Sequence, residues 1–122
     1  MFIQDHANAI QISHRFAPMV ISGRKKQQIV RTLKIVPDDT ILLALNEIPA
    51  KESGLDLWME KCITVQSIKF SHIGIYLDGA RLIPAAADHF AHGEGFIDFQ
   101  ELLDWYFAYN QTDEFEGFVI YW

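Results

Sequence analysis

This sequence has a single cysteine, no long apolar run and no acid over residues 6–37. Cys62 is the only cysteine among 122 residues, so no intramolecular disulfide can form, which is typical of a reducing cytoplasm. No apolar run approaches the ~20 residues that a membrane span needs. The start, Met1–His6, has no basic residues ahead of an apolar segment, so no secretory signal is predicted. We therefore expect a cytoplasmic protein that does not bind a membrane.

Charge is distributed unevenly along the chain. The formal net charge is -6, from 10 Lys and Arg against 16 Asp and Glu. Residues 6–37 contain six basic residues and no acid, whereas residues 88–122 contain eight acids and no Lys or Arg. The net acidity argues against non-specific coating of DNA, but a local basic patch is still able to bind nucleic acid. The acidic last third is a candidate surface for a basic protein partner.

The pattern of apolar and turn residues predicts one mixed domain over residues 1–122. Half of the residues are hydrophobic and 13% are aromatic, which excludes disorder. Alternating or continuous apolar runs predict strands, and proline starts with glycine stops predict helices. The predicted strands are Ile10–Ile12, Lys26–Ile35, Thr40–Leu45, Cys62–Phe70, His72–Leu77, Ala80–Ile83 and Phe115–Trp122; the predicted helices are Phe16–Gly23, Pro84–Gly93 and Asp98–Asn110; Asn46–Lys61 is a predicted loop. We expect an α+β fold, a small β-barrel with two or three helices at one end.

Four short motifs follow one another in the order of a known family. They are Ile21–Lys25, Pro37–Ile41, Leu77–Leu82, and Glu94–Phe96 with the closing segment Phe118–Trp122. In these motifs the chain resembles the ASCH domain, a small barrel related to the PUA RNA-binding domains. It is most similar to the short versions found in bacteria and their phages. The resemblance covers nearly the whole chain and implies a PUA-like barrel that binds RNA or a nucleotide; we expect no cofactor.

The same resemblance leaves an enzyme as the alternative, and a phage-type protein-interaction module with an acidic C-terminal face is a further one. Characterised relatives include an amidohydrolase that acts on acetylated cytidine and a protein that cleaves RNA. The resemblance places the amidohydrolase lysine on Lys25 and its glutamate on Glu94, and its threonine position falls on Gln28. Gln28 has no hydroxyl and cannot act as an oxygen nucleophile. The enzyme would therefore be a hydrolase of a modified nucleoside, or a ribonuclease, that uses water with Lys25 and Glu94 as its catalytic residues.

The basic segment supplies most of the predicted binding site. The candidate ligand- or RNA-binding residues are Arg24, Lys25, Lys26, Gln28, Arg31, Lys34 and Glu94. Lys25 and Arg31 can neutralise a phosphate or carbonyl oxygen, and the amide of Gln28 offers a base edge both a donor and an acceptor. We expect a cleft formed by Lys25, Gln28, Arg31 and Glu94. The alternative is a solvated basic face that binds nothing.

Glu94 is the acid with the most unusual surroundings in the sequence. It lies between Gly93 and Gly95, so a ligand or a backbone segment can approach it closely. Beside Lys25 it can accept a hydrogen bond from a base amine or a sugar hydroxyl, or act as a general base. The alternative is an ion pair or cap at a helix end.

Two further residue types are weaker candidates. His89 and His92 have the spacing of one helix face, but no third ligand follows at a recognised spacing, so we predict no metal site. Tyr76, in a predicted strand, can stack a base, although aromatic residues in strands more often belong to the core.

Overall fold

The computed structural model describes residues 9–45, 56–110 and 113–122. Within them the chain forms eight strands and three helices, so the α+β prediction is confirmed. In chain order these are β1 (Ala9–Ile12), α1 (Ala17–Ile21), β2 (Gln27–Val30), β3 (Thr40–Leu45), β4 (Asp56–Lys61), β5 (Thr64–Ser71), β6 (Gly74–Leu77), β7 (Ala80–Arg81), α2 (Pro84–Glu94), α3 (Phe99–Asn110) and β8 (Glu114–Tyr121).

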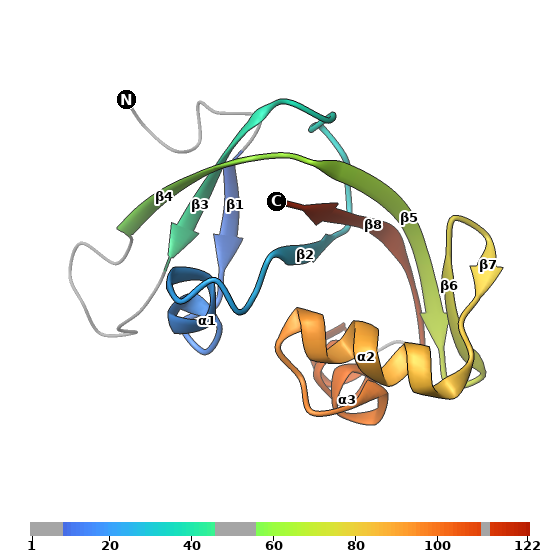
Figure 1. Ribbon diagram of the computed structural model, residues 1–122. Helices are drawn as coiled ribbons and strands as arrows, with labels where there is room; N and C mark the ends of the chain where they lie inside the picture. The colour runs from blue at the N-terminus through green and yellow to red at the C-terminus, as the bar shows by residue number, and fades with distance from the viewer. Residues whose placement is uncertain (1–8, 46–55, 111–112) are drawn as a thin grey trace.

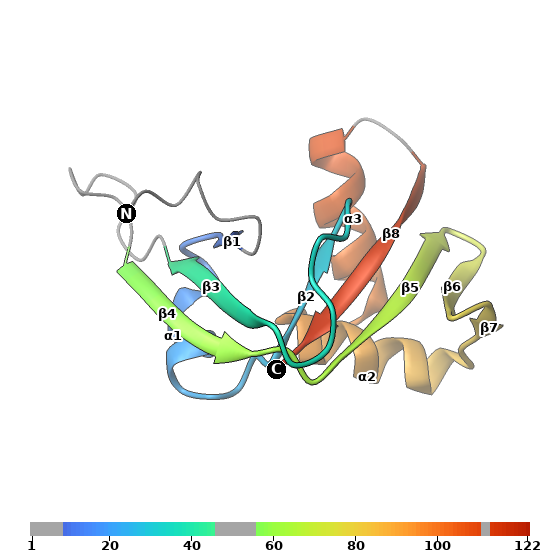
Figure 2. The same ribbon diagram turned by 90° about the horizontal axis from the view of Figure 1, so that it is seen from above.

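The strands form two sheets. One has the order β1-β3-β4, and the other has the order β2-β8-β5-β6-β7. A short link at Cys62 and Ile63 joins β4 to β5, so the chain arches from one sheet into the other (Figure 1). The sheets splay apart when seen from above (Figure 2). The predicted closed barrel is wrong for the described residues, because β1 and β4 end one sheet while β2 and β7 end the other.

Helices α2 and α3 cover one face of the five-stranded sheet (Figure 1). The ring of Phe70 on β5 stacks on Phe115 of β8 and meets the edge of Tyr106 on α3, with centroids 5.0 and 5.4 Å apart. Phe16, just before α1, packs edge to face against Phe96 and Trp105. These aromatic contacts join the helices, α1 and the sheet around one buried core.

The C-terminal strand is central, as its apolar character on both faces predicted. Strand β8 lies between β2 and β5 and pairs antiparallel with both. Val119 and Ile120 are completely buried. The hairpin predicted at Asp78 and Gly79 is also confirmed, because both have positive φ, 49° and 82°, as a two-residue turn between paired strands requires.

Several predicted boundaries are shifted in the structure, three of them for clear physical reasons. Residues 56–61 of the predicted loop form β4, which pairs with β3 along its whole length; residues 46–55 lie outside the described part. The strand predicted over Lys26–Ile35 ends at Val30, because the chain then leaves β8 and Ile35 enters the core. Helix α2 continues through Gly93, and Gly95, with φ of 106°, takes the left-handed position that ends it.

The start of α3 is close to its prediction. The Asp98 carboxylate accepts from the backbone N–H of Glu101 at 2.9 Å, as in a capping box. The Glu101 carboxylate accepts from the N–H of Ile97, whereas in a regular capping box it would accept from the N–H of the N-cap residue, here Asp98. In the part of the chain that the structure describes, no helix is long and apolar enough to cross a membrane.

Candidate functional site

Lys25 and Glu94 meet in the interior, which confirms the prediction that they approach each other. The Lys25 ammonium lies 3.6 Å from Oε1 of Glu94 and donates a hydrogen bond of 2.7 Å to the Glu94 backbone carbonyl. Only 1% of Lys25 and 2% of Glu94 is exposed. The two groups therefore form an ion pair that is closed off from solvent.

The rest of the Glu94 carboxylate is also occupied. Its Oε1 accepts from the backbone N–H of Ile29 at 3.1 Å, and its Oε2 accepts from the Gln27 amide at 2.9 Å. Because β2 is an edge strand, the Glu94 carboxylate satisfies an N–H that no neighbouring strand could reach. The carboxylate thus ties the end of α2 to the edge of the five-stranded sheet.

The glycines on either side of Glu94 explain how this contact forms. A Cβ added to Gly93 would lie 2.6 Å from the Gln27 amide oxygen, and one added to Gly95 would lie 2.7 Å from the ring of Phe16. The approach at these glycines is close, but it is made by side chains and not by the ligand or backbone segment that was expected. The groups that approach are the protein's own Gln27 and Phe16.

Burial controls the electrostatics around the pair. It lowers the pKa of Lys25 from its ordinary 10.5, and the Glu94 charge opposes this shift. The Lys25 ammonium also lies 5.2 Å from the centroid of the Phe16 ring, a cation–π contact that favours the charged form. Burial and the negative charge of Glu94 raise the pKa of Tyr106 well above 10 and that of Tyr121 to about 12.

Three other predicted site residues, Gln28, Arg31 and Lys34, line one hollow between β1 and β2. Its volume is about 480 Å³, and Gln11 from β1 lines it from the opposite side. Among its described lining residues none is Asp or Glu, whereas Arg31 and Lys34 bring two positive charges. The Gln28 amide donates to the backbone carbonyl of Ile29 at 3.0 Å. The hollow is therefore basic and rich in amide groups.

The predicted site residues do not share one cleft. Side chains alternate along a strand, so Gln27 and Gln28 lie on opposite sides of β2. Gln27 reaches the buried Glu94, whereas Gln28 lines the hollow. Sequence reasoning assigned no contact between Gln27 and Glu94, although Gln27 shares the face of the buried Ile29. Arg24 and Lys26 are exposed and do not line this hollow.

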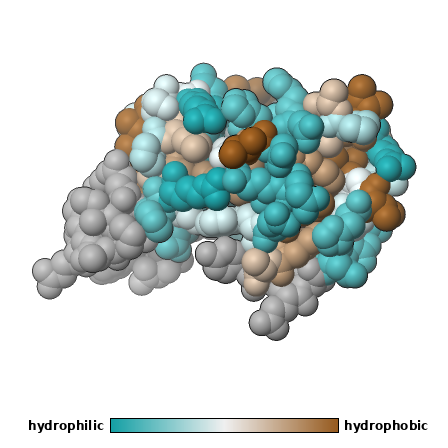
Figure 3. Space-filling model, turned by 90° about the horizontal axis from the view of Figure 1, so that it is seen from below, coloured by the Kyte–Doolittle hydropathy of each residue, from teal (hydrophilic) through white to brown (hydrophobic). Residues whose placement is uncertain are grey.

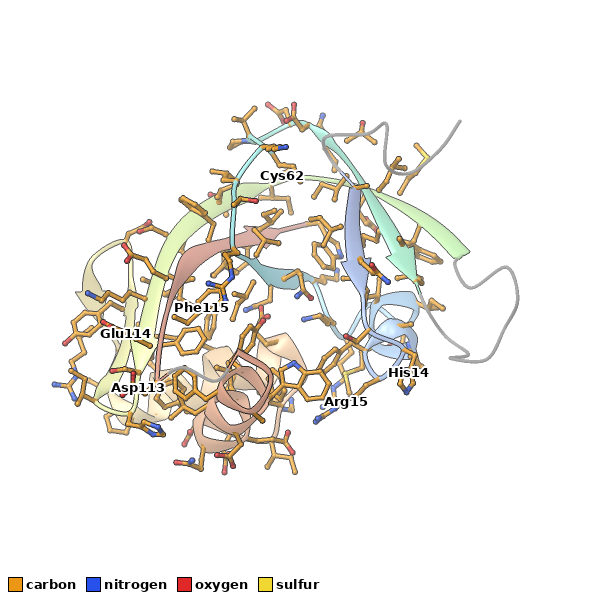
Figure 4. The ribbon with its side chains drawn as sticks, turned by 180° about the vertical axis from the view of Figure 1, so that it is seen from behind. His14, Arg15, Cys62, Asp113, Glu114 and Phe115 are labelled. Carbon is orange, nitrogen blue, oxygen red and sulfur yellow. The ribbon has the colours of Figure 1, made fainter. Side chains whose placement is uncertain are left out.

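Arg31 also borders a second hollow, of about 640 Å³, on the outer face of the five-stranded sheet. Its guanidinium carbon lies 4.9 Å from the centroid of the Phe115 ring. In Figure 4, Phe115 lies on the helix side of β8 and the preceding Glu114 points away from it. Arg31 is thus the one predicted site residue that borders both described hollows.

Most acids of the C-terminal third are used inside the fold. Glu101 forms an ion pair of 2.9 Å with Arg15, which lies beside α3 (Figure 4), and Glu114 pairs with Lys69 at 3.6 Å. Asp88 accepts from the N–H of Phe99. The face that carries α2 and α3 is largely hydrophilic, with scattered hydrophobic side chains (Figure 3). The two ion pairs reduce the free negative charge available to a protein partner.

His89 and His92 are both exposed on α2. Within residues 9–45, 56–110 and 113–122, no three His, Cys, Asp or Glu side chains gather where they could hold a metal ion. Cys62 is buried between β4 and β5, and burial together with the charges of Asp39 and Asp38 raises the pKa of its thiol.

The fold and the site define a small α+β protein with a buried lysine–glutamate pair beside a basic hollow. Comparison with family models, with curated proteins and with solved structures finds no match for this chain.

Proposed function

We propose that this chain is an ASCH-type, PUA-like domain that binds RNA or a nucleotide in the hollow between β1 and β2. The observation that carries the proposal is the convergence of Gln28, Arg31 and Lys34 on a hollow whose described lining includes no carboxylate. A phosphate gains from two cations in such a place, and an amide can pair with a base edge. The order of the four motifs supports the same proposal.

In this proposal the Lys25–Glu94 pair has a structural role and is not a catalytic dyad. Both groups are buried and hydrogen-bonded to the protein itself, so neither reaches a substrate in this arrangement. This geometry disfavours the hydrolase and ribonuclease alternatives. The pair instead holds β2 against α2, and β2 carries Gln28 to the hollow. The proposal places the protein in the cytoplasm, where a single reduced cysteine is expected.

Titration of a labelled single-stranded RNA at low salt tests the proposal. Lys34→Ala is expected to weaken binding about three- to tenfold, because one phosphate contact is lost. Lys61→Ala is the matched control, because Lys61 is an exposed lysine on β4 that lines neither hollow. Equal binding by the two variants, or no binding by the wild type, would reject this site.

A further inference from the structure

The second hollow has a different chemical character from the basic one. It lies over the outer face of β5, β6 and β8, and its charged lining residues are Arg31, Lys69, Glu114 and Glu116. Two positive and two negative charges cancel, so this hollow does not favour a phosphate. Its lining also includes the aromatic residues Tyr76 and Phe118.

The sheet register places the two rings on either side of β5. Phe118 on β8 pairs with Ser67 of β5, and Tyr76 on β6 pairs with Lys69 of β5. All four residues belong to the same face, because Ser67 and Lys69 are two positions apart. Strands two apart in a sheet lie roughly 10 Å from each other. This spacing leaves room for one flat ring between the side chains of Phe118 and Tyr76, above the small Ser67.

Both rings are available to a ligand. Phe118 and Tyr76 are half-buried, whereas Phe70 and Phe115, on the opposite face, are buried in the core. Open sheet faces that carry aromatic residues are a known platform for the unstacked bases of single-stranded RNA. Two half-buried rings on one open face of the sheet therefore suit a base.

Glu116 adds a selective group to this platform. It lies opposite Lys69 in the register, but the ion pair of Lys69 goes to Glu114, at 3.6 Å. Among the described residues the side chain of Glu116 has no hydrogen bond or ion pair, and it is exposed where it lines the hollow. An ionised carboxylate only accepts hydrogen bonds. Guanine is the base whose Watson–Crick edge presents two adjacent N–H donors, so it matches a single carboxylate in a bidentate way.

We infer that the outer hollow is a guanine subsite for the RNA strand whose phosphates occupy the hollow between β1 and β2. Arg31 borders both hollows and lies where a strand would pass from one to the other. This inference rests on the proposed function, because it takes the β1–β2 hollow as the phosphate site. It adds the ligand class: single-stranded RNA with a guanine, longer than one nucleotide.

The test compares labelled hexamers of uridine with hexamers in which one position is guanosine or adenosine. Wild type is expected to bind the guanosine hexamer about tenfold more tightly than the other two, the size of one good bidentate base contact. Glu116→Gln is expected to remove this preference, because a neutral amide is no longer an acceptor at both atoms. Phe118→Leu, which keeps an apolar side chain but removes the ring, is expected to weaken binding at least fivefold.

Two controls separate the possible failures. Ile63→Ala removes an exposed apolar side chain outside the hollow, and Lys34→Ala reports on the β1–β2 hollow alone. If Lys34→Ala weakens binding while Phe118→Leu and Glu116→Gln have no effect, the guanine subsite is wrong and the proposed function stands. A preference for adenosine would also overturn the guanine assignment. If no hexamer binds, both the proposed function and this inference fail.

Discussion

The ammonium of Lys25 lies 3.6 Å from the carboxylate of Glu94, although 69 positions separate them in the chain. Lys25 follows α1 and precedes β2, and Glu94 is the last residue of α2. The pair therefore joins the N-terminal part of the fold to the helices that cover the five-stranded sheet. Its burial makes it costly to break, because removing one partner leaves the other as an uncompensated charge.

Lys25→Met is expected to lower the free energy of unfolding by about 3 to 5 kcal/mol, the usual cost of orphaning a buried charge. The measurement is urea unfolding at neutral pH. Lys26→Met, at the next and exposed position, is the control and should change stability by less than about 0.5 kcal/mol. The double variant Lys25→Met/Glu94→Gln should cost less than the sum of the single changes, because the orphaned charge is gone. Strict additivity would show that the two groups do not interact.

Much of the fold could be predicted from local patterns. The hairpin at Asp78 and Gly79, the apolar strand β3 and the central strand β8 each carry their own signal of turn residues or apolar runs. Strand β4 was missed because its pattern is weak, and pairing with β3 makes it a strand. The open arrangement of the two sheets was also missed, since sheet closure depends on which edges pair and not on local sequence.

The candidate site was only partly predictable, for a similar reason. The opposite charges of Lys25 and Glu94, with the resemblance to ASCH motifs, were enough to predict that the two residues meet. They did not reveal the burial of the pair, which depends on how α2 packs against β2. The alternation of side chains on β2 did contain the information that Gln27 and Gln28 point to different sides. It could not say which of the two would meet Glu94.

Gly95→Ala should destabilise the fold more than Gly79→Ala, although both glycines have positive φ. At Gly79 the added methyl meets nothing within 4 Å, so only backbone strain remains, about 1 kcal/mol. At Gly95 the methyl would lie 2.7 Å from the buried ring of Phe16, which raises the expected cost to roughly 2 to 4 kcal/mol. Urea unfolding of both variants measures the difference. Equal losses would mean that Phe16 moves aside freely.

Stability should fall as the pH rises from 10 toward 12. The folded protein keeps the Tyr121 proton up to about pH 12, whereas the unfolded chain releases it near 10. The unfolded state then binds fewer protons, so the free energy of unfolding decreases with pH. Tyr106 acts in the same direction. The lowered pKa of Lys25 makes stability rise with pH. This effect ends near pH 10.5, where the lysine of the unfolded chain also loses its proton.

Tyr121→Phe tests this account, because phenylalanine has no proton to release. Unfolding free energies measured between pH 10.5 and 11.5 should fall less steeply in the variant than in the wild type. A parallel measurement at pH 8 gives the constant cost of losing the 2.6 Å hydrogen bond from Tyr121 to Gln66. Identical slopes above pH 10.5 would remove Tyr121 from the explanation.

The purified protein is expected not to hydrolyse acetylated cytidine to cytidine and acetate. Lys25 and Glu94 are buried, and Gln28 has no nucleophilic hydroxyl. Gln28→Thr should not create the activity either, because position 28 lies on the side of β2 away from Glu94. Chromatography of the reaction products measures turnover. Turnover that Glu94→Gln abolishes would contradict this expectation and return the pair to catalysis.

Salt dependence provides the last prediction, because it counts phosphate contacts. Arg31 and Lys34 line the hollow between β1 and β2, and the exposed Lys26 just before β2 offers a third cation, whereas Lys25 is buried and does not count. Three contacts at roughly -0.7 each give a slope of about -2 for log K against log salt with single-stranded RNA. Lys34→Ala should reduce the slope by about 0.7, and Lys61→Ala should leave it unchanged. A slope that does not respond to Lys34→Ala would show that RNA, if bound, lies elsewhere than the hollow between β1 and β2.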